Sequence, residues 1–309
     1  MKRKFENKFS NTVLCRSGTT PTAGISAEER NSKLMNIFKL EFKSTFKSLI
    51  LWSCIVAFIL VLFMAFYPSM SGDEMKDLIN TKMSAIPESI LKAMGIADIP
   101  DFTDMMQYYA YVLQYVVLAG AIYASILGAN TLIKEETDGT IEYLYAQPVT
   151  RIQITLYKLL SSISSFFIFI AAIAVVSSVI FLMFKPENTD FIKIITDTKI
   201  ILSGVMFSGL IFLSIGFLIS TVIKSAKQAT PISIGIVFGT YILGMFSKTV
   251  SDKVALADNL KYLSPIDYGM PLDMLKNGFD TINIVLGILI IVVCISFSFV
   301  LYNKKDLKI

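Results

Sequence analysis

The chain has 309 residues, of which 54% are hydrophobic and 17% are charged. Soluble domains carry roughly 25% charged residues, so this composition argues against a soluble enzyme or binding module and indicates a membrane protein. The sequence has no histidine, and two of its three cysteines, Cys54 and Cys294, lie in apolar runs. A Cys/His zinc cluster is therefore excluded, no metal site is expected, and the cysteines argue against a disulfide framework.

Residues 1–34 are expected to be a disordered extension without a structural role. The first 31 residues are polar and rich in Ser, Thr and Gly, which is typical of disorder. They also lack the apolar core of roughly 7–15 residues that a secretory signal needs. We therefore expect the folded domain to cover residues 35–309.

Six long stretches contain no Asp, Glu, Lys or Arg. A helix needs about 20 apolar residues to cross a bilayer core of about 30 Å, and each stretch is long enough. A barrel is a poor alternative, because its strands are about 10 residues long and alternate polar with apolar residues. We predict an all-α polytopic membrane protein with six transmembrane helices, at about 49–67, 106–133, 159–184, 200–223, 229–247 and 281–302.

Six spans place both termini on one side of the membrane. Lys and Arg are about twice as dense in the segments expected on that side as in those on the other. The positive-inside rule then makes this side cytoplasmic. We expect a multi-pass protein of the plasma membrane with cytoplasmic N and C termini.

The segment 33–49 precedes the first span and has two neighbouring stripes at helical spacing. The apolar stripe consists of Met35, Phe38, Phe42, Phe46 and Leu49, and the basic stripe consists of Lys39, Lys43 and Lys47. This pattern is typical of an amphipathic helix that lies in the membrane interface. The alternative is a charged N-terminal extension of the first span.

The sequence EETDGTIEYLYAQPVTR, at 135–151, separates the second and third spans. Ile141, Leu144 and Tyr145 share one helical face, Gly139 allows a sharp turn, and Pro148 ends the helix. A helix of about two turns is marginal in water, so it must pack against lipid headgroups or a partner protein. Physical reasoning leaves both open, with Arg151 and Lys158 able to meet lipid phosphates.

Small residues recur every four positions in two spans. They are Gly120, Ala124 and Gly128 in the second span, and Gly235 and Gly239 in the fifth. Such spacing allows close approach of helices in lipid. It indicates either packing within one subunit, or a subunit interface or translocation wall.

The spans also limit the source of energy for any transport. No acid or base lies near the middle of a span, whereas proton- or sodium-coupled carriers usually keep one there. The chain has no G-x-x-x-x-G-K-[ST] phosphate loop, so it cannot be an ATPase itself. We expect no catalytic residue and no cofactor on this chain.

The region between the second and third spans resembles the ABC-2 type permease family, the membrane subunits of one class of ATP-driven exporters. The residues that carry the resemblance are Glu135, Glu136, Gly139, Thr140, Glu142, Leu144, Pro148, Thr150, Arg151 and Lys158. The resemblance extends over about 35–309, and segment 33–49 looks like the connecting helix of that family. One departure is Tyr143 and Tyr145, where aliphatic residues are usual.

The resemblance implies a short cytoplasmic coupling helix that docks on a separate ABC ATPase subunit, which would bind ATP and Mg²⁺. It assigns ATPase coupling to Glu135, Glu136, Gly139, Thr140, Glu142, Leu144, Pro148 and Arg151. It also implies a second permease subunit, so that the permease is a homodimer or a heterodimer. Membrane lipids are expected as further partners, and nucleic acid is not. The alternative function is a non-transport membrane anchor or sensor for a cytoplasmic partner. The substrate stays open.

Overall fold

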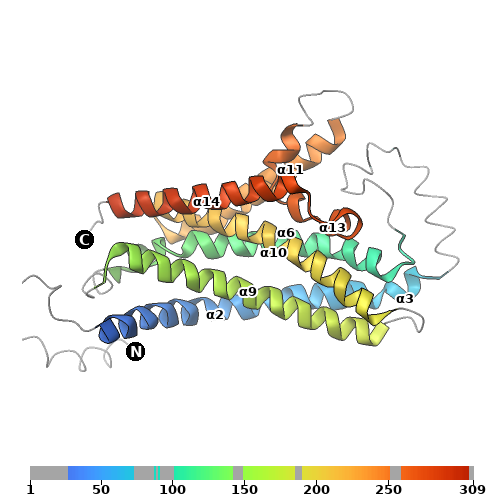
Figure 1. The fold of residues 1–309 in the computed structure, drawn as a ribbon, viewed down its shortest axis with the longest axis horizontal. Coiled ribbons are helices and arrows are strands. Elements are labelled where there is room, and N and C mark those ends of the chain that lie inside the picture. The colour runs from blue at the N-terminus through green and yellow to red at the C-terminus, as the bar shows by residue number, and fades with distance from the viewer. Residues whose placement is uncertain are drawn as a thin grey trace, which may run out of the picture.

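The computed structural model describes residues 27–72, 87, 90, 101–141, 149–184, 190–250 and 259–305. Within these ranges the chain forms helices and no strand (Figure 1). Six helices are long and apolar enough to cross a membrane, which confirms the predicted all-α architecture. They are α2 (Ala27–Ala65), α6 (Met105–Asn130), α9 (Arg151–Phe184), α10 (Phe191–Val222), α11 (Ala229–Val250) and α14 (Thr281–Lys304).

Short elements lie at the two ends of this bundle. One end holds the start of α2 and the end of α14, and we call it the termini end (Figure 1). It also holds α7 (Ile133–Asp138) and η1 (Ala226–Gln228). The opposite end holds α3 (Tyr67–Met70), η2 (Asn259–Leu263), η3 (Asp267–Gly269) and α13 (Pro271–Asn277).

Three aspartates fix where helices begin at the opposite end. The side chain of Asp104 accepts hydrogen bonds from the backbone N–H groups of Met106, at 2.8 Å, and Gln107, at 3.1 Å. Asp190 and Asp280 cap α10 and α14 in the same way. The first N–H groups of a helix have no partner within the helix, so these carboxylates satisfy them at the membrane boundary.

The centre of the bundle is the crossing of α6 and α10. Gly128 and Gly216 lie at the crossing point, and each faces the backbone of the other helix. A Cβ atom at Gly128 would lie 2.8 Å from Phe217 N, and one at Gly216 would lie 3.0 Å from Ala129 N. The two backbones therefore approach too closely for any side chain there. The helices α2, α9, α11 and α14 surround this central pair.

The predicted N-terminal helix is continuous with the first span. α2 runs unbroken from Ala27 to Ala65 and lies beside α9 (Figure 1). This is the arrangement of the alternative interpretation, a charged extension of the span. Phe38 and Phe42 are partly buried and stack on each other, with their ring centroids 6.3 Å apart. Phe46 is exposed. Contact of this aromatic row with lipid stays a prediction.

The basic stripe and the expected domain boundary complete the description of α2. Lys39, Lys43 and Lys47 are all exposed. The helix begins at Ala27, before the boundary expected after residue 34, and Leu34 is buried in a cluster with Ile154 on α9. Residues 1–26 lie outside the described residues.

Candidate functional site

The candidate site is α7, the short helix that follows α6 at the termini end. Thr131 ends α6, and its hydroxyl bonds to the Leu127 carbonyl and the Ser162 hydroxyl, both at 2.8 Å. Ile133, the first residue of α7, is fully buried between the ends of α6, α10 and α11. These contacts attach α7 firmly to the bundle and hold its next residues in a fixed orientation.

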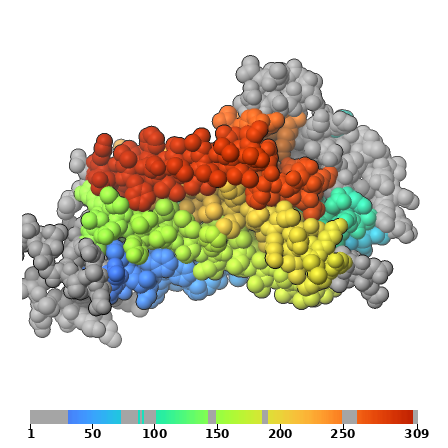
Figure 2. All heavy atoms as spheres, viewed as in Figure 1, coloured from blue at the N-terminus to red at the C-terminus, as the bar shows by residue number. Residues whose placement is uncertain are grey.

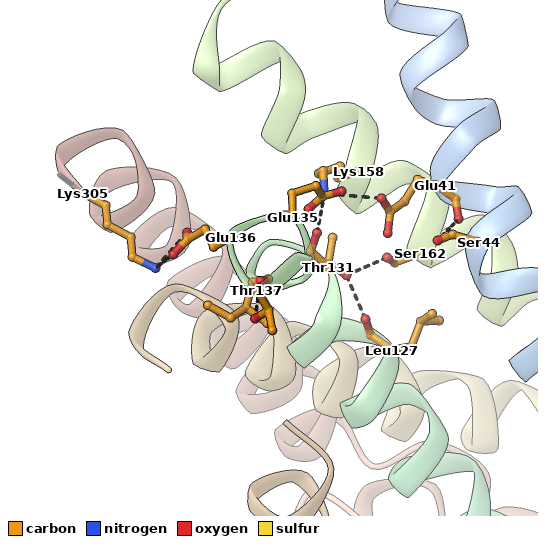
Figure 3. Close-up of polar contacts among 11 residues, drawn as sticks. Glu41, Ser44, Leu127, Thr131, Glu135, Glu136, Thr137, Lys158, Ser162 and Lys305 are labelled. Carbon is orange, nitrogen blue, oxygen red and sulfur yellow. Dashed lines mark hydrogen bonds and ion pairs between the residues drawn. The ribbon is translucent and has the colours of Figure 1, made fainter. Parts of the chain in front are cut away.

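Lys158 forms the buried centre of the site. Its side chain is 1% exposed, and its Nζ lies 2.7 Å from the Thr131 carbonyl and 3.3 Å from Glu41 Oε2. It also forms an ion pair with Glu135 of α7 (Figure 3). A buried charge is tolerated only when it is paired and hydrogen-bonded, and here the partners come from α2, the end of α6, and α7.

The next residue of α7 forms an ion pair on the other side. Glu136 binds Lys305, which follows the last turn of α14, with Nζ–Oε distances of 2.8 and 2.9 Å (Figure 3). Both side chains are more than 20% exposed. Arg151, at the start of α9, donates from its guanidinium to the Lys305 carbonyl at 3.0 Å. The end of α14 is thus attached to α7 and to α9.

The third contact is made by Thr137. Its hydroxyl accepts a hydrogen bond from the backbone N–H of Ala226, at 2.9 Å. Ala226 belongs to η1, the short connection between α10 and α11. Three successive residues of α7 therefore contact α9, the end of α14, and the connection of α10 to α11. The helix α2 is joined to this turn indirectly, because Glu41 binds the same Lys158.

α7 ends at Gly139, directly before the predicted coupling helix. Gly139 has φ of +66°, and its N–H bonds to the Glu135 carbonyl as a helix C-cap. This left-handed conformation favours glycine, and it gives the sharp turn predicted at this position. Ile141, of the predicted apolar face, is buried. The N–H of Thr140 bonds to the same carbonyl at 3.0 Å. Glu142, Leu144 and Pro148 lie outside the described residues.

The structure places the predicted coupling residues in two groups. Glu135, Glu136 and Arg151 form contacts within the chain, so these side chains position the flanks of the coupling segment. Lys158 was expected to be able to meet lipid phosphates, and this expectation is wrong because the side chain is buried. Gly139 and Thr140 are exposed at the exit from α7.

Glu41 and Lys305 were not identified as site residues from the sequence. Glu41 is the only acid between 31 and 72, an isolated charge beside a row of lysines, which was a usable signal. Lys158 similarly shares a helical stripe with the buried Ser162 and Phe169. No signal in the sequence marks Lys305, because its partner Glu136 is 169 residues away.

The predicted small residues are buried in one helix and exposed on the other. Gly120, Ala124 and Gly128 are buried in α6, where Gly120 faces Phe169 and Gly128 faces α10. Gly235 and Gly239 are exposed on α11, and a Cβ atom at either would meet nothing within 4 Å. The first set packs within the subunit, whereas the second set has no neighbour within 4 Å of such a Cβ atom among the described residues.

Comparison with known protein families decides the identity of this architecture. The sequence model of the family described as "ABC-2 family transporter protein" matches residues 35–307. The chain belongs to the ABC-2 transporter family. With its six membrane-crossing helices, this ABC-2 family protein is a multi-pass membrane protein. None of the curated proteins compared with this ABC-2 family protein matches it.

Proposed function

We propose that this protein is the permease subunit of an ATP-driven exporter, with its termini end on the cytoplasmic side of the plasma membrane. The observation that carries the proposal is the position of α7. It lies directly before the segment that resembles a coupling helix, and three of its successive side chains hold different parts of the bundle. A separate ABC ATPase would bind ATP and Mg²⁺ and dock on that segment, since this chain has no phosphate loop.

The contacts of α7 give this coupling a physical route. Removing one partner of a buried ion pair costs about 3–5 kcal/mol, so α7, α9 and α2 are expected to move as one unit around Lys158. A push on the segment between Gly139 and Arg151 would therefore reach the spans instead of being absorbed by a flexible loop. Alternation between inward- and outward-open states requires that these contacts differ between the two states.

The proposal includes a second permease subunit, and α11 is the surface that supports it. In their most apolar windows α2 and α11 are each 22% buried and α14 is 17% buried. In the same stretches the mean hydropathy is 2.9 for α2 and 3.2 for α14, but only 1.6 for α11. The value for α11 is close to the 1.8 of α6, which is 67% buried. α11 has the exposure of a lipid-facing helix and the composition of a packed one.

Small residues at a helix surface allow close packing in lipid, and the exposed face of α11 contains Gly235 and Gly239. Exposed apolar side chains from Phe238, Ile242 and Phe246 lie on the same helix. We therefore assign this face to a second copy of the chain. A different permease subunit in that place would appear as a heteromeric complex in the purification described below.

Purification of the complex in mild detergent tests the proposed function first. An ABC ATPase that remains bound in stoichiometric amount supports a permease. A kinase or another regulatory protein in its place would support a membrane anchor or sensor, as would the chain alone. The mass of the complex then gives the number of copies of this chain.

Variants at the buried ion pair test the route of coupling. Two spin labels at the opposite end, introduced by Phe66→Cys and Leu263→Cys, report movement through the distance between them. The chain that carries them lacks Cys15, Cys54 and Cys294. Both positions are exposed. We expect ATP to change this distance in the wild-type complex but not in Lys158→Met or in the isosteric Glu135→Gln, although both variants retain the bound ATPase.

The matched control is Lys227→Met, which removes an exposed lysine from η1 at the same end of the bundle. It should respond to ATP as the wild type does. Should Lys158→Met fail to fold, Glu135→Gln decides, because it leaves Lys158 with Glu41 and the Thr131 carbonyl. A normal response in Glu135→Gln would refute α7 as the route of coupling.

A further inference from the structure

The end of α14 makes contacts that differ from those of the rest of the helix. α14 lies along the surface of the bundle (Figure 2), and 17% of its most apolar window is buried. Its termini-side end is nevertheless held by charged groups from two other helices. These are Glu136 on α7 and Arg151 on α9, which flank the predicted coupling segment on either side.

Arg151 acts as a helix cap for α14. Its guanidinium lies 3.0 Å from the Lys305 carbonyl and 3.4 Å from the Asn303 carbonyl. The last carbonyls of a helix lack partners within the helix, and they carry the negative end of its dipole. The Arg151 guanidinium donates hydrogen bonds to these carbonyls, and its positive charge is favourable at the negative end of the dipole. The start of α9 and the end of α14 therefore stabilise each other.

Lys305 joins this cap to α7. Its backbone is extended, with φ of −67° and ψ of 123°, so the chain leaves the helix and the side chain reaches Glu136 (Figure 3). One residue therefore uses its carbonyl for Arg151 and its ammonium for Glu136. The two described flanks of the coupling segment are held together through Lys305.

The two ion pairs of α7 differ in burial, and so in strength. The difference lies in the lysines, since Lys158 is 1% exposed and Lys305 is 23% exposed, whereas Glu135 and Glu136 are 20% and 21% exposed. Water and salt screen a partly exposed pair, but breaking a pair that contains a fully buried charge is costly. Glu135 and Glu136 are neighbours, yet the contact of Glu135 with Lys158 is harder to break than that of Glu136 with Lys305.

We propose that the end of α14, with Lys305 bound to Glu136 and Arg151, is a releasable clamp on the coupling segment. Closed, it ties the last span to α7 and α9. Open, it lets α7 and α9 move without α14, while Lys158 still joins α7 to α9 and α2. The role of the clamp in transport rests on the proposed function. The contacts that form the clamp lie within this chain and do not depend on that function.

The clamp is tested first on the full chain without an ATPase. Spin labels are introduced by Asp138→Cys and Asn303→Cys, both at exposed positions, in the chain without its native cysteines. The labelled chain is studied in lipid nanodiscs. We expect one narrow distance in the wild type and loss of that single distance in Lys305→Met. At about 1 M salt, where the screening length is about 3 Å, the wild type should show the same loss.

The matched control is Lys304→Met, which removes the neighbouring exposed lysine and should leave the distance unchanged. Exchange of the two charges, in Glu136→Lys with Lys305→Glu, should restore the narrow distance that Lys305→Met loses. A role in folding alone would not produce this rescue. An unchanged distance in Lys305→Met would overturn the clamp and would leave the proposed function untouched.

Release is tested on the complex with its co-purified ATPase. We expect the Asp138–Asn303 distance to increase when ATP is trapped and to return when nucleotide is removed. The same distance in both states would show a fixed contact and would overturn release. If no ATPase is bound to the chain, the proposed function fails, while the result in nanodiscs still decides whether the clamp exists.

Discussion

The small residues of α6 and those of α11 have the same spacing but opposite surroundings. Gly128 on α6 faces the backbone of α10, and Gly216 on α10 faces the backbone of α6. Gly235 and Gly239 on α11 meet nothing within 4 Å in the described part of the chain. The comparison teaches that the same sequence pattern can lie at a close helix crossing or on an exposed helix face, so spacing alone does not say what small residues pack against.

The largest effect is expected for Gly128→Leu. The new side chain would collide with backbone atoms of α10, including Phe217 N at 2.8 Å from its Cβ, and backbone cannot move aside as a flexible side chain can. Overpacking of a core costs about 1–3 kcal/mol and sometimes more. We expect about a tenfold loss of monodisperse protein, measured by fluorescence-detected size-exclusion chromatography.

Gly239→Leu is the matched control for this experiment, since it adds the same side chain to a helix of the same bundle. It should leave the amount of folded protein unchanged. Equal loss in both variants would contradict the difference between α6 and α11.

A smaller effect is expected for Gly216→Ala. One methyl group at this position would lie against Ser125 O and 3.0 Å from Ala129 N, so α6 and α10 must separate slightly. The cost should be about 1–3 kcal/mol, with a melting temperature lower by several degrees in a thermal unfolding assay. A melting temperature equal to that of the wild type would show that the crossing is looser than its geometry implies.

The pair of substitutions Gly235→Leu and Gly239→Leu should change assembly and not folding. Both side chains would project from the exposed face of α11, where we place the second copy of the chain. We expect the variant to keep its melting temperature and to shift from dimer to monomer in native mass spectrometry. A dimer of unchanged stability would remove α11 from the subunit interface.

The smallest effect is expected for Gly120→Ala, a position in the same stripe of α6 as Gly128. A Cβ atom there would lie 3.5 Å from a carbon of the Phe169 ring, which is ordinary van der Waals contact. Alanine also favours a helix over glycine by roughly 0.5–1 kcal/mol. The melting temperature should be unchanged or slightly higher, and a clear decrease would mean that the whole stripe of α6 is closely packed.

Much of the fold could be predicted because it depends on local properties of the chain. Charged residues are excluded from the bilayer core, so the charge-free stretches predicted the number of spans. The turn at Gly139 was also predictable, since its position between a helix end and an amphipathic stretch favours a left-handed residue. The continuity of α2 was not, because an amphipathic stripe fits an interfacial helix and an extended span equally well.

The contacts of the candidate site could not be predicted from the sequence. A coupling role of Glu135, Glu136 and Arg151 stays a prediction, and the structure adds that all three bind within the chain. Glu135 and Glu136 are identical in type and adjacent in sequence. Their different partners, Lys158 and Lys305, follow from the direction in which each side chain leaves one short helix.

The sequence alone determined that this protein has six helices long and apolar enough to cross a membrane. That feature follows from the energy of placing charge in lipid. Only the tertiary structure decided which apolar faces meet protein, because lipid and protein interiors are equally apolar and hydropathy cannot distinguish them. It also decided the ion pairs of α7, since a helical stripe shows which residues lie together but not which distant helix they face.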